Sequence, residues 1–131
     1  MSKVITMKFP ETMTEQEVFD ASVSFMLKQN KKSMEHEACR YRGPNGTACA
    51  VGCLIQDDEY DEKMDGFDGE MDNTSVNSLD KHNLLPARLR QHINLLKILQ
   101  SVHDTCAVDT WPVHFYEIAL ERGLNIDVMK S

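Results

Sequence analysis

A histidine and three cysteines near the middle of the chain are the residues best suited to chemistry. His36, Cys39, Cys49 and Cys53 follow the spacing H-x2-C-x9-C-x3-C, and thiolate and imidazole groups are the ligands of structural zinc sites. The last two cysteines, however, lie in an apolar run, where free cysteines often serve as small buried hydrophobic residues. The spacing therefore favours buried thiols and no cofactor, with zinc as the alternative.

A nucleophilic cysteine is a second possibility, because a thiolate forms readily beside a base or a positive charge. Cys39 precedes Arg40 and lies three residues after His36, and Cys106 lies three residues after His103. No pattern around Cys39 or Cys106 matches a cysteine-enzyme signature. We therefore expect no catalytic residue here.

A strongly acidic segment follows the cysteines. Calcium loops carry acids at alternating positions, a glycine at the sixth and a bidentate acid at the twelfth. A loop that starts at Asp61 has Asp65, Gly66 and Asp72 at the fifth, sixth and twelfth positions, but Lys63 at the third. We therefore rank three interpretations of this segment. A solvated surface loop comes first, an acidic patch that faces a partner second, and a calcium site third.

Composition narrows the class of protein. The 131 residues suffice for one domain, 1–131, and 41% apolar with 27% charged residues is an ordinary globular composition. The formal net charge of −7 makes nucleic acid an unlikely partner, because proteins that bind its phosphates carry basic surfaces. The first residues lack the apolar run of a signal peptide and no window reaches the length of a membrane span, so we expect a cytoplasmic location with reduced thiols.

Helices are expected on both sides of the cysteine-rich stretch. The first begins after Thr14, which forms a capping-box pattern with Glu17. Its apolar face is predicted to comprise Val18, Ala21, Ser22, Phe25 and Met26. Three more helices are expected: a short one over 76–81, a long one from Pro86 to about His103, and one from Asp109 or Thr110 to Gly123.

The sequence Gly43-Pro44-Asn45-Gly46 predicts a chain reversal, because proline presets its φ and Asn-Gly tolerates positive φ. We expect residues 40–42 and 47–49 to pair around it, which would bring Cys39 and Cys49 close together. The apolar run 49–55 is expected to form a buried strand or helical turn, with Gly52 allowing a close backbone approach. The fold class is thus mainly α (α+β): three main helices, short helices and a small β-hairpin near residues 39–50.

Three motifs resemble a small family of uncharacterised bacterial and bacteriophage proteins. They are C-x-Y-R-G-P from Cys39, C-A-V-G-C-L-I from Cys49 and the helix that ends in His103-Asp104. Members often carry a small residue at the position of Cys53, which argues against zinc. The resemblance covers roughly residues 15–123 and implies a bacterial or phage setting, but it transfers no catalytic residue.

The predicted function is that of a small acidic binding or regulatory protein that acts by protein–protein contact, in the host cytoplasm if the chain is phage-encoded. The alternative is a zinc- or thiol-dependent enzyme or regulator that uses His36, Cys39 and Cys49. We expect no membrane contact, and the sequence leaves the oligomeric state open. The expected binding residues, with 40–42 presumed exposed, are Arg40, Tyr41, Arg42, Asp57, Asp58, Glu59 and Tyr60.

Overall fold

The computed structural model describes residues 8–35, 38–66 and 75–130. The helices are α1 (Glu15–Gln29), α2 (Val76–Lys81), α3 (Ala87–Arg90), α4 (Ile93–Thr105) and α5 (Trp111–Arg122). The strands β1 (Met34–Glu35) and β2 (Ala38–Cys39) form an antiparallel hairpin. The predicted mainly α fold, with three main helices, short helices and a small hairpin, is confirmed.

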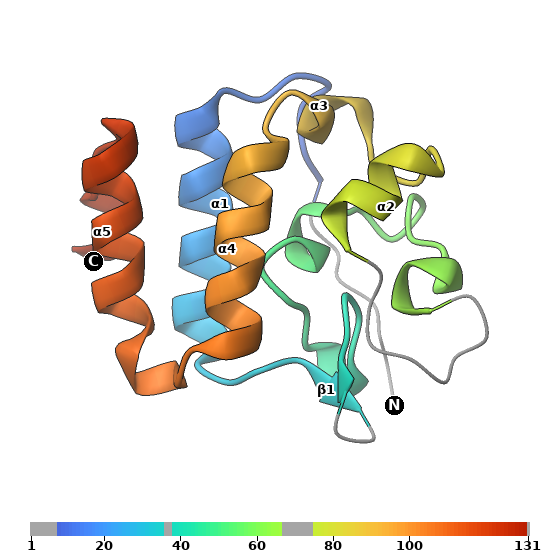
Figure 1. Ribbon diagram of the computed structural model, residues 1–131, viewed down its shortest axis with the longest axis horizontal. Coiled ribbons are helices and arrows are strands. Elements are labelled where there is room, and N and C mark those ends of the chain that lie inside the picture. Colours follow the sequence, from blue (N-terminus) through green and yellow to red (C-terminus); the bar gives the residue numbers. More distant parts are fainter. Residues whose placement is uncertain (1–7, 36–37, 67–74, 131) are drawn as a thin grey trace.

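The three long helices α1, α4 and α5 contact one another and form one half of the molecule (Figure 1). The other half holds the hairpin, α2 and short 3-10 segments; there α2 packs on α4, and the 3-10 turn Gly52–Leu54 packs on α1. Tyr41 from this half and Phe19, Trp111 and Phe115 from the long helices belong to one buried cluster. A single hydrophobic core therefore joins the two halves.

Helix α1 begins as the capping box predicts. The Thr14 side chain accepts a hydrogen bond from the Glu17 N–H at 3.1 Å, and the Glu17 carboxylate accepts one from the Thr14 N–H at 2.8 Å. The predicted buried face was partly wrong, because Phe19 and Val23 are buried where Ala21 and Phe25 were expected. The physical reason is that α1 is covered on more than one side, by the 3-10 turn and by α4 and α5.

The predicted long helix is two helices, separated at Gln91 and His92. Arg88 lies seven residues before Leu95, so an unbroken helix would place its guanidinium group on the apolar stripe of α4. In the broken arrangement Arg88 instead bonds Glu59 and the carbonyl of Leu54. The break thus separates a buried charge from the apolar face.

The hairpin lies earlier in the chain than predicted. Its strands pair Met34 with Cys39, whereas the predicted strands keep a single bridge between Arg42 and Ala48. The ladder does not extend because the backbone N–H groups of Tyr41 and Arg42 donate to a side-chain carboxylate. The turn itself is as expected, with positive φ at residues 45 and 46.

The apolar run is buried throughout, from Ala48 to Ile55, and contains the 3-10 turn Gly52–Leu54. A Cβ on Gly52 would lie 1.9 Å from the carbonyl oxygen of Tyr41. The expected close backbone approach at Gly52 is therefore confirmed. The backbone of the apolar run therefore packs directly against the backbone of residue 41.

The last long helix is confirmed at both ends. Helix α5 ends at Gly123, which has φ +68°, and the Leu124 N–H donates to the Ala119 carbonyl at 2.9 Å.

No helix in the described part of the chain has both the length and the apolar character needed to span a membrane.

Candidate functional site

The first three predicted binding residues lie inside the protein. Only 6% of Arg40, none of Tyr41 and 1% of Arg42 is exposed. The expectation that these side chains are exposed is wrong. Burying two guanidinium groups is favourable only if anions and hydrogen-bond acceptors accompany them, and the acidic segment supplies both.

Asp65 is the centre of this compensation. Its carboxylate accepts hydrogen bonds from the N–H groups of Tyr41 (2.6 Å) and Arg42 (3.2 Å) and from the Tyr60 hydroxyl (2.6 Å). Its backbone carbonyl accepts one from Arg40 at 2.7 Å. Burial, followed by the bond to Asp65, raises the pKa of Tyr60 and keeps this phenol a donor. Asp65 thus holds the backbone of Tyr41 and Arg42 and the side chain of Arg40 from within the protein.

This arrangement argues against the calcium loop and corrects the solvated-loop prediction. Met64 and Asp65 are buried rather than solvated. The carboxylate of Asp65 is occupied by protein donors, and that of Asp61 accepts the Lys63 N–H at 2.9 Å. The proposed twelfth ligand, Asp72, lies outside the described residues. The two described acids that would bind calcium stabilise the local fold instead.

Arg42 is neutralised by another predicted binding residue. Its Nη1 lies 2.6 Å from Asp57 Oδ1, and its Nη2 donates to the carbonyl of Ile55. The guanidinium carbon lies 5.3 Å from the centroid of the Tyr60 ring, a cation–π distance. Asp57 is exposed, but its carboxylate forms an ion pair with the buried Arg42. Asp58 is exposed too, and accepts a bond from the Gln56 side chain at 3.2 Å.

Arg88 repeats this pattern with Glu59. Both of its terminal nitrogens lie 2.7 Å from the Glu59 carboxylate, and Nη2 also donates to the Leu54 carbonyl at 2.7 Å. The sequence suggested that Arg88 lies on a solvated helix face, but the side chain is buried. The available signal was its spacing of seven and eleven residues from Leu95 and Leu99, which places a charge on an apolar stripe.

The Glu59 pair predicts a pH dependence of stability. Partial burial raises the pKa of Glu59, but hydrogen bonds from Arg88 and the Gln56 N–H, with the Arg88 charge, outweigh it and bring the pKa below its ordinary 4.5. A carboxyl group with a lowered folded pKa stabilises the fold above its unfolded pKa and loses this effect as the pH falls through the folded value. We expect Glu59→Gln to unfold more easily than the wild type at neutral pH, by a margin that shrinks below pH 4.5.

Urea unfolding of both proteins between about pH 3 and pH 7 measures this margin. Asp58→Asn is the control, because it removes the neighbouring exposed negative charge without touching Arg88. A Glu59→Gln margin that is constant with pH would contradict the prediction.

The thiols of Cys49 and Cys53 lie fully buried, as the sequence favoured. Burial raises the pKa of Cys49 well above its ordinary value and that of Cys53 to about 12. Cys49 Sγ accepts the Gly52 N–H at 3.3 Å, and Cys53 Sγ donates to the Ala50 carbonyl at 3.3 Å. Both groups are therefore neutral thiols that are bonded within their own turn.

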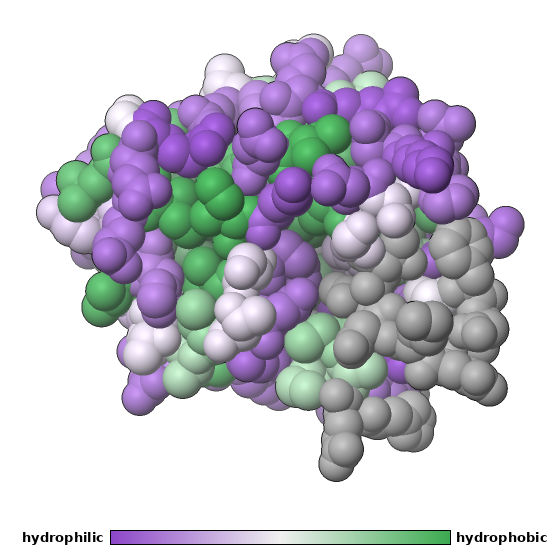
Figure 2. All heavy atoms as spheres, viewed as in Figure 1, coloured by the Kyte–Doolittle hydropathy of each residue, from purple (hydrophilic) through white to green (hydrophobic). Residues whose placement is uncertain are grey.

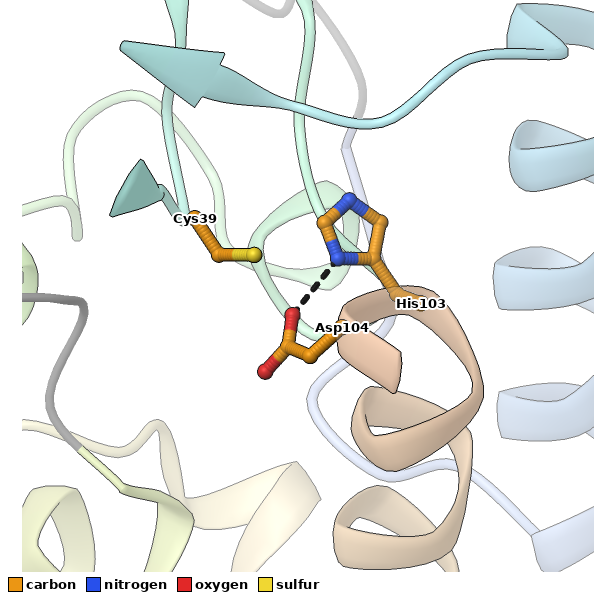
Figure 3. Close-up of side chains that lie close together, drawn as sticks. All are labelled: Cys39, His103 and Asp104. Atoms are coloured by element: carbon orange, nitrogen blue, oxygen red, sulfur yellow. Dashed lines mark hydrogen bonds and ion pairs between the residues drawn. The ribbon is translucent and has the colours of Figure 1, made fainter. Parts of the chain in front are cut away.

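The predicted zinc ligands do not converge in the described part of the chain. His36 lies outside it, and Cys39, Cys49 and Cys53 do not lie within 4.8 Å of one another. The one group of metal-type side chains among the described residues instead combines Cys39 with His103 and Asp104. These residues come from β2 and from the last turn of α4, and their side chains point toward one another (Figure 3).

The hydrogen bonds of His103 decide what this cluster can do. Nδ1 lies 2.7 Å from Asp104 Oδ1, and Nε2 accepts the backbone N–H of Ser33 at 3.0 Å. Because the Ser33 N–H can only donate, Nε2 is unprotonated and Nδ1 carries the proton. The buried ring also lies 5.7 Å from the Trp111 ring. His103 therefore tethers the segment before β1 to α4.

This proton placement suits neither a metal nor a nucleophile. A metal at Nδ1 would leave the proton of a neutral imidazole on Nε2, facing the N–H of Ser33. The cluster also has three donors, whereas structural zinc takes four. Neither ring nitrogen is free to accept a proton from Cys39, and both are unavailable to Cys106 as well. The candidate His103–Cys106 pair is therefore not formed.

A second candidate surface covers α4 and α5. Val113, Tyr116 and Leu120 occupy i, i+3 and i+7 positions and are 62%, 43% and 64% exposed. A groove of about 330 Å³ lies between the two helices; its lining comprises Ile98, Ser101, Val102, Cys106, His114, Glu117, Ile118 and Glu121. Figure 2 shows hydrophobic atoms gathered over this part of the surface, bordered by hydrophilic ones. Sequence reasoning did not single out this surface, although the i, i+3, i+7 spacing was available.

Comparisons of the chain with protein families, with curated proteins and with solved structures found no match. The family resemblance and the bacterial or phage setting therefore stay predictions.

Proposed function

We propose that this protein is a small acidic binding protein that recognises another protein through its α4/α5 face. This name denotes the exposed stripe Val113, Tyr116 and Leu120 together with the adjoining groove that contains Ile98. The observation that carries the proposal is the stripe itself. Three large apolar side chains on one helix face, each more than two-fifths exposed, favour an interface when a groove adjoins them.

The charges at this face favour a basic partner. Glu117 and Glu121 line the groove, and the chain carries a net charge of −7. An amphipathic helix that bears lysine or arginine beside its apolar residues would match both features. The same charges would repel a second copy of this chain. We therefore commit to a basic amphipathic helix of another protein as the occupant.

The proposal moves the contact surface away from the residues that the sequence favoured. Arg40, Tyr41 and Arg42 are buried, and Asp57 and Glu59 neutralise internal arginines. A partner that used these acids would compete with the fold itself. The cytoplasmic, bacterial or phage setting that we infer rests on the resemblance.

A zero-length carbodiimide crosslinker tests the proposal, because it joins carboxylates to lysines in direct contact. Tagged protein is crosslinked in bacterial lysate at physiological salt, and the crosslinked peptides are sequenced. We expect Glu117 or Glu121 to be joined to lysines of an amphipathic helix in one partner. Val113→Ser/Leu120→Ser should reduce that crosslink more than about tenfold, since both residues are exposed and the fold is retained.

Met34→Ser is the matched control, because Met34 is an apolar residue 39% exposed on the hairpin, away from this face. It should leave the crosslink unchanged. Three outcomes would overturn the proposal. The crosslinks could join only copies of this chain, they could involve only residues outside α4 and α5, or they could be equally frequent in the Val113→Ser/Leu120→Ser variant.

A further inference from the structure

A second pocket on α4 lies next to the His103–Asp104 pair and shares Ser101 with the groove between α4 and α5. It measures about 370 Å³, and its lining comprises Tyr41, Ser75, Val76, Lys97, Gln100, Ser101, Asp104 and Thr105. Its wall is mostly carbon with a few polar groups. A volume of this size accommodates a small organic molecule.

The carboxylate of Asp104 is fixed in this wall by one of its oxygens. Oδ1 accepts hydrogen bonds from His103 Nδ1 (2.7 Å) and from Gln100 Nε2 (2.9 Å). No donor from the described residues bonds Oδ2. In Figure 3 the second oxygen points away from the His103 ring. Asp104 thus presents one uncommitted anionic oxygen beside the pocket.

The two donors to Asp104 are themselves held rigidly. His103 is fully buried and accepts the Ser33 N–H at 3.0 Å, and Gln100 accepts the Val51 N–H at 3.2 Å. Asp104 therefore keeps its orientation without a ligand. Such preorganisation lowers the entropy that a ligand would lose on binding.

No lysine or arginine of the described residues forms an ion pair with this carboxylate, although the Lys32 ammonium group donates to the backbone carbonyl of Asp104 at 3.4 Å. Lys97 also lines the pocket, two helical turns before Asp104 on α4. It forms no ion pair within 4.0 Å with a described acid, so its charge stays available to repel a cation that enters the pocket. A carboxylate only 28% exposed gains from a partner that supplies both a positive charge and N–H donors.

We propose that this pocket binds a small organic ammonium ion, with the ammonium group on Asp104 Oδ2 and the apolar body against Val76. The Tyr41 phenol stays neutral, because burial raises its pKa, so it adds no second anion. The pocket shares Ser101 with the groove of the α4/α5 face but no other lining residue. Either proposal can fail while the other holds.

Benzylamine is the probe, and benzyl alcohol is its neutral match of similar shape. Both are titrated into isotope-labelled protein while the backbone amide signals are followed by NMR. We expect benzylamine to shift the amides of Val76, Gln100, Ser101 and Thr105 in a saturable manner. Benzyl alcohol should bind at least about tenfold more weakly, because it lacks the charge-assisted hydrogen bond.

Asp104→Asn is the decisive variant, since an asparagine oxygen can still accept from His103 and Gln100. It should lower the affinity for benzylamine about tenfold or more and leave benzyl alcohol unchanged. Asp109→Asn is the control, because it removes an exposed negative charge that does not line the pocket. It should leave both affinities unchanged.

Lys97→Met keeps the test decisive if Asp104→Asn does not fold. It removes the positive charge that repels an ammonium ion from the pocket, and should raise the affinity for benzylamine alone. Equal affinities for the two probes, shifts confined to amides outside the pocket, or unchanged benzylamine binding in Asp104→Asn would overturn the proposal.

Discussion

Replacing Gly52 with alanine is expected to lower the free energy of unfolding by about 3 kcal/mol or more. The new Cβ would lie 1.9 Å from the carbonyl oxygen of Tyr41 and 2.7 Å from its carbonyl carbon. Those atoms are backbone and cannot rotate away. The Tyr41 N–H is also held by Asp65 at 2.6 Å, so relief would require separating the apolar run from residues 40–42.

Gly123→Ala is the matched control for this experiment. Gly123 has φ +68°, and nothing lies within 4 Å of the position that its Cβ would take. Its cost is therefore only the left-handed conformation of an alanine, about 1 to 2 kcal/mol. Urea denaturation monitored by circular dichroism compares the two variants. If Gly52→Ala proved as stable as Gly123→Ala, the close approach at residue 52 would be disproved.

The second large effect is expected at Asp65, where replacement with alanine should cost about 3 to 5 kcal/mol. The change leaves the N–H groups of Tyr41 and Arg42 and the hydroxyl of Tyr60 without their acceptor. These donors are mostly buried, and water cannot replace the carboxylate without opening the fold. The negative charge that strengthens these three hydrogen bonds is lost as well.

Two further variants separate the contributions of Asp65. Tyr60→Phe removes only the hydroxyl donor and should cost about 1 kcal/mol. Asp58→Ala removes an exposed carboxylate of the same segment and should change the free energy of unfolding by less than about 0.5 kcal/mol. Thermal and urea unfolding measure all three. Asp65→Ala behaving like Asp58→Ala would show that the internal network adds nothing to stability.

This network also limits where the protein can bind a partner. Segments 40–42 and 57–65 carry many of the charges that a sequence would offer as a binding surface, yet most of their groups contact one another. Apart from Met34 on the hairpin, the exposed large apolar side chains of the described residues lie on α4 and α5. A high density of charged residues along the chain is thus a poor guide to a contact surface, because arginines and acids from different segments can pair with one another inside the fold.

The sequence by itself determined the features that depend on near neighbours. The capping box at Thr14, the turn at residues 45 and 46, the helix end at Gly123 and the close approach at Gly52 were all predictable. The first three follow from the preferences of a residue and its neighbours within about one turn. For Gly52 the sequence indicated only that a backbone would come close, and the structure shows that this backbone belongs to Tyr41. The helical fold class followed from the same local signals.

Only the tertiary structure decided which charges are buried and which side chains form a site. Tyr41 and Asp65 lie 24 residues apart, Arg88 and Glu59 lie 29 apart, and Ser33 and His103 lie 70 apart. A buried charge is stable only when a partner of opposite charge or a hydrogen-bonding group contacts it. Here these partners come from distant parts of the chain, and no local sequence pattern predicts such contacts. Likewise, the tertiary structure places Cys39 beside His103 and Asp104 rather than in a cluster with Cys49.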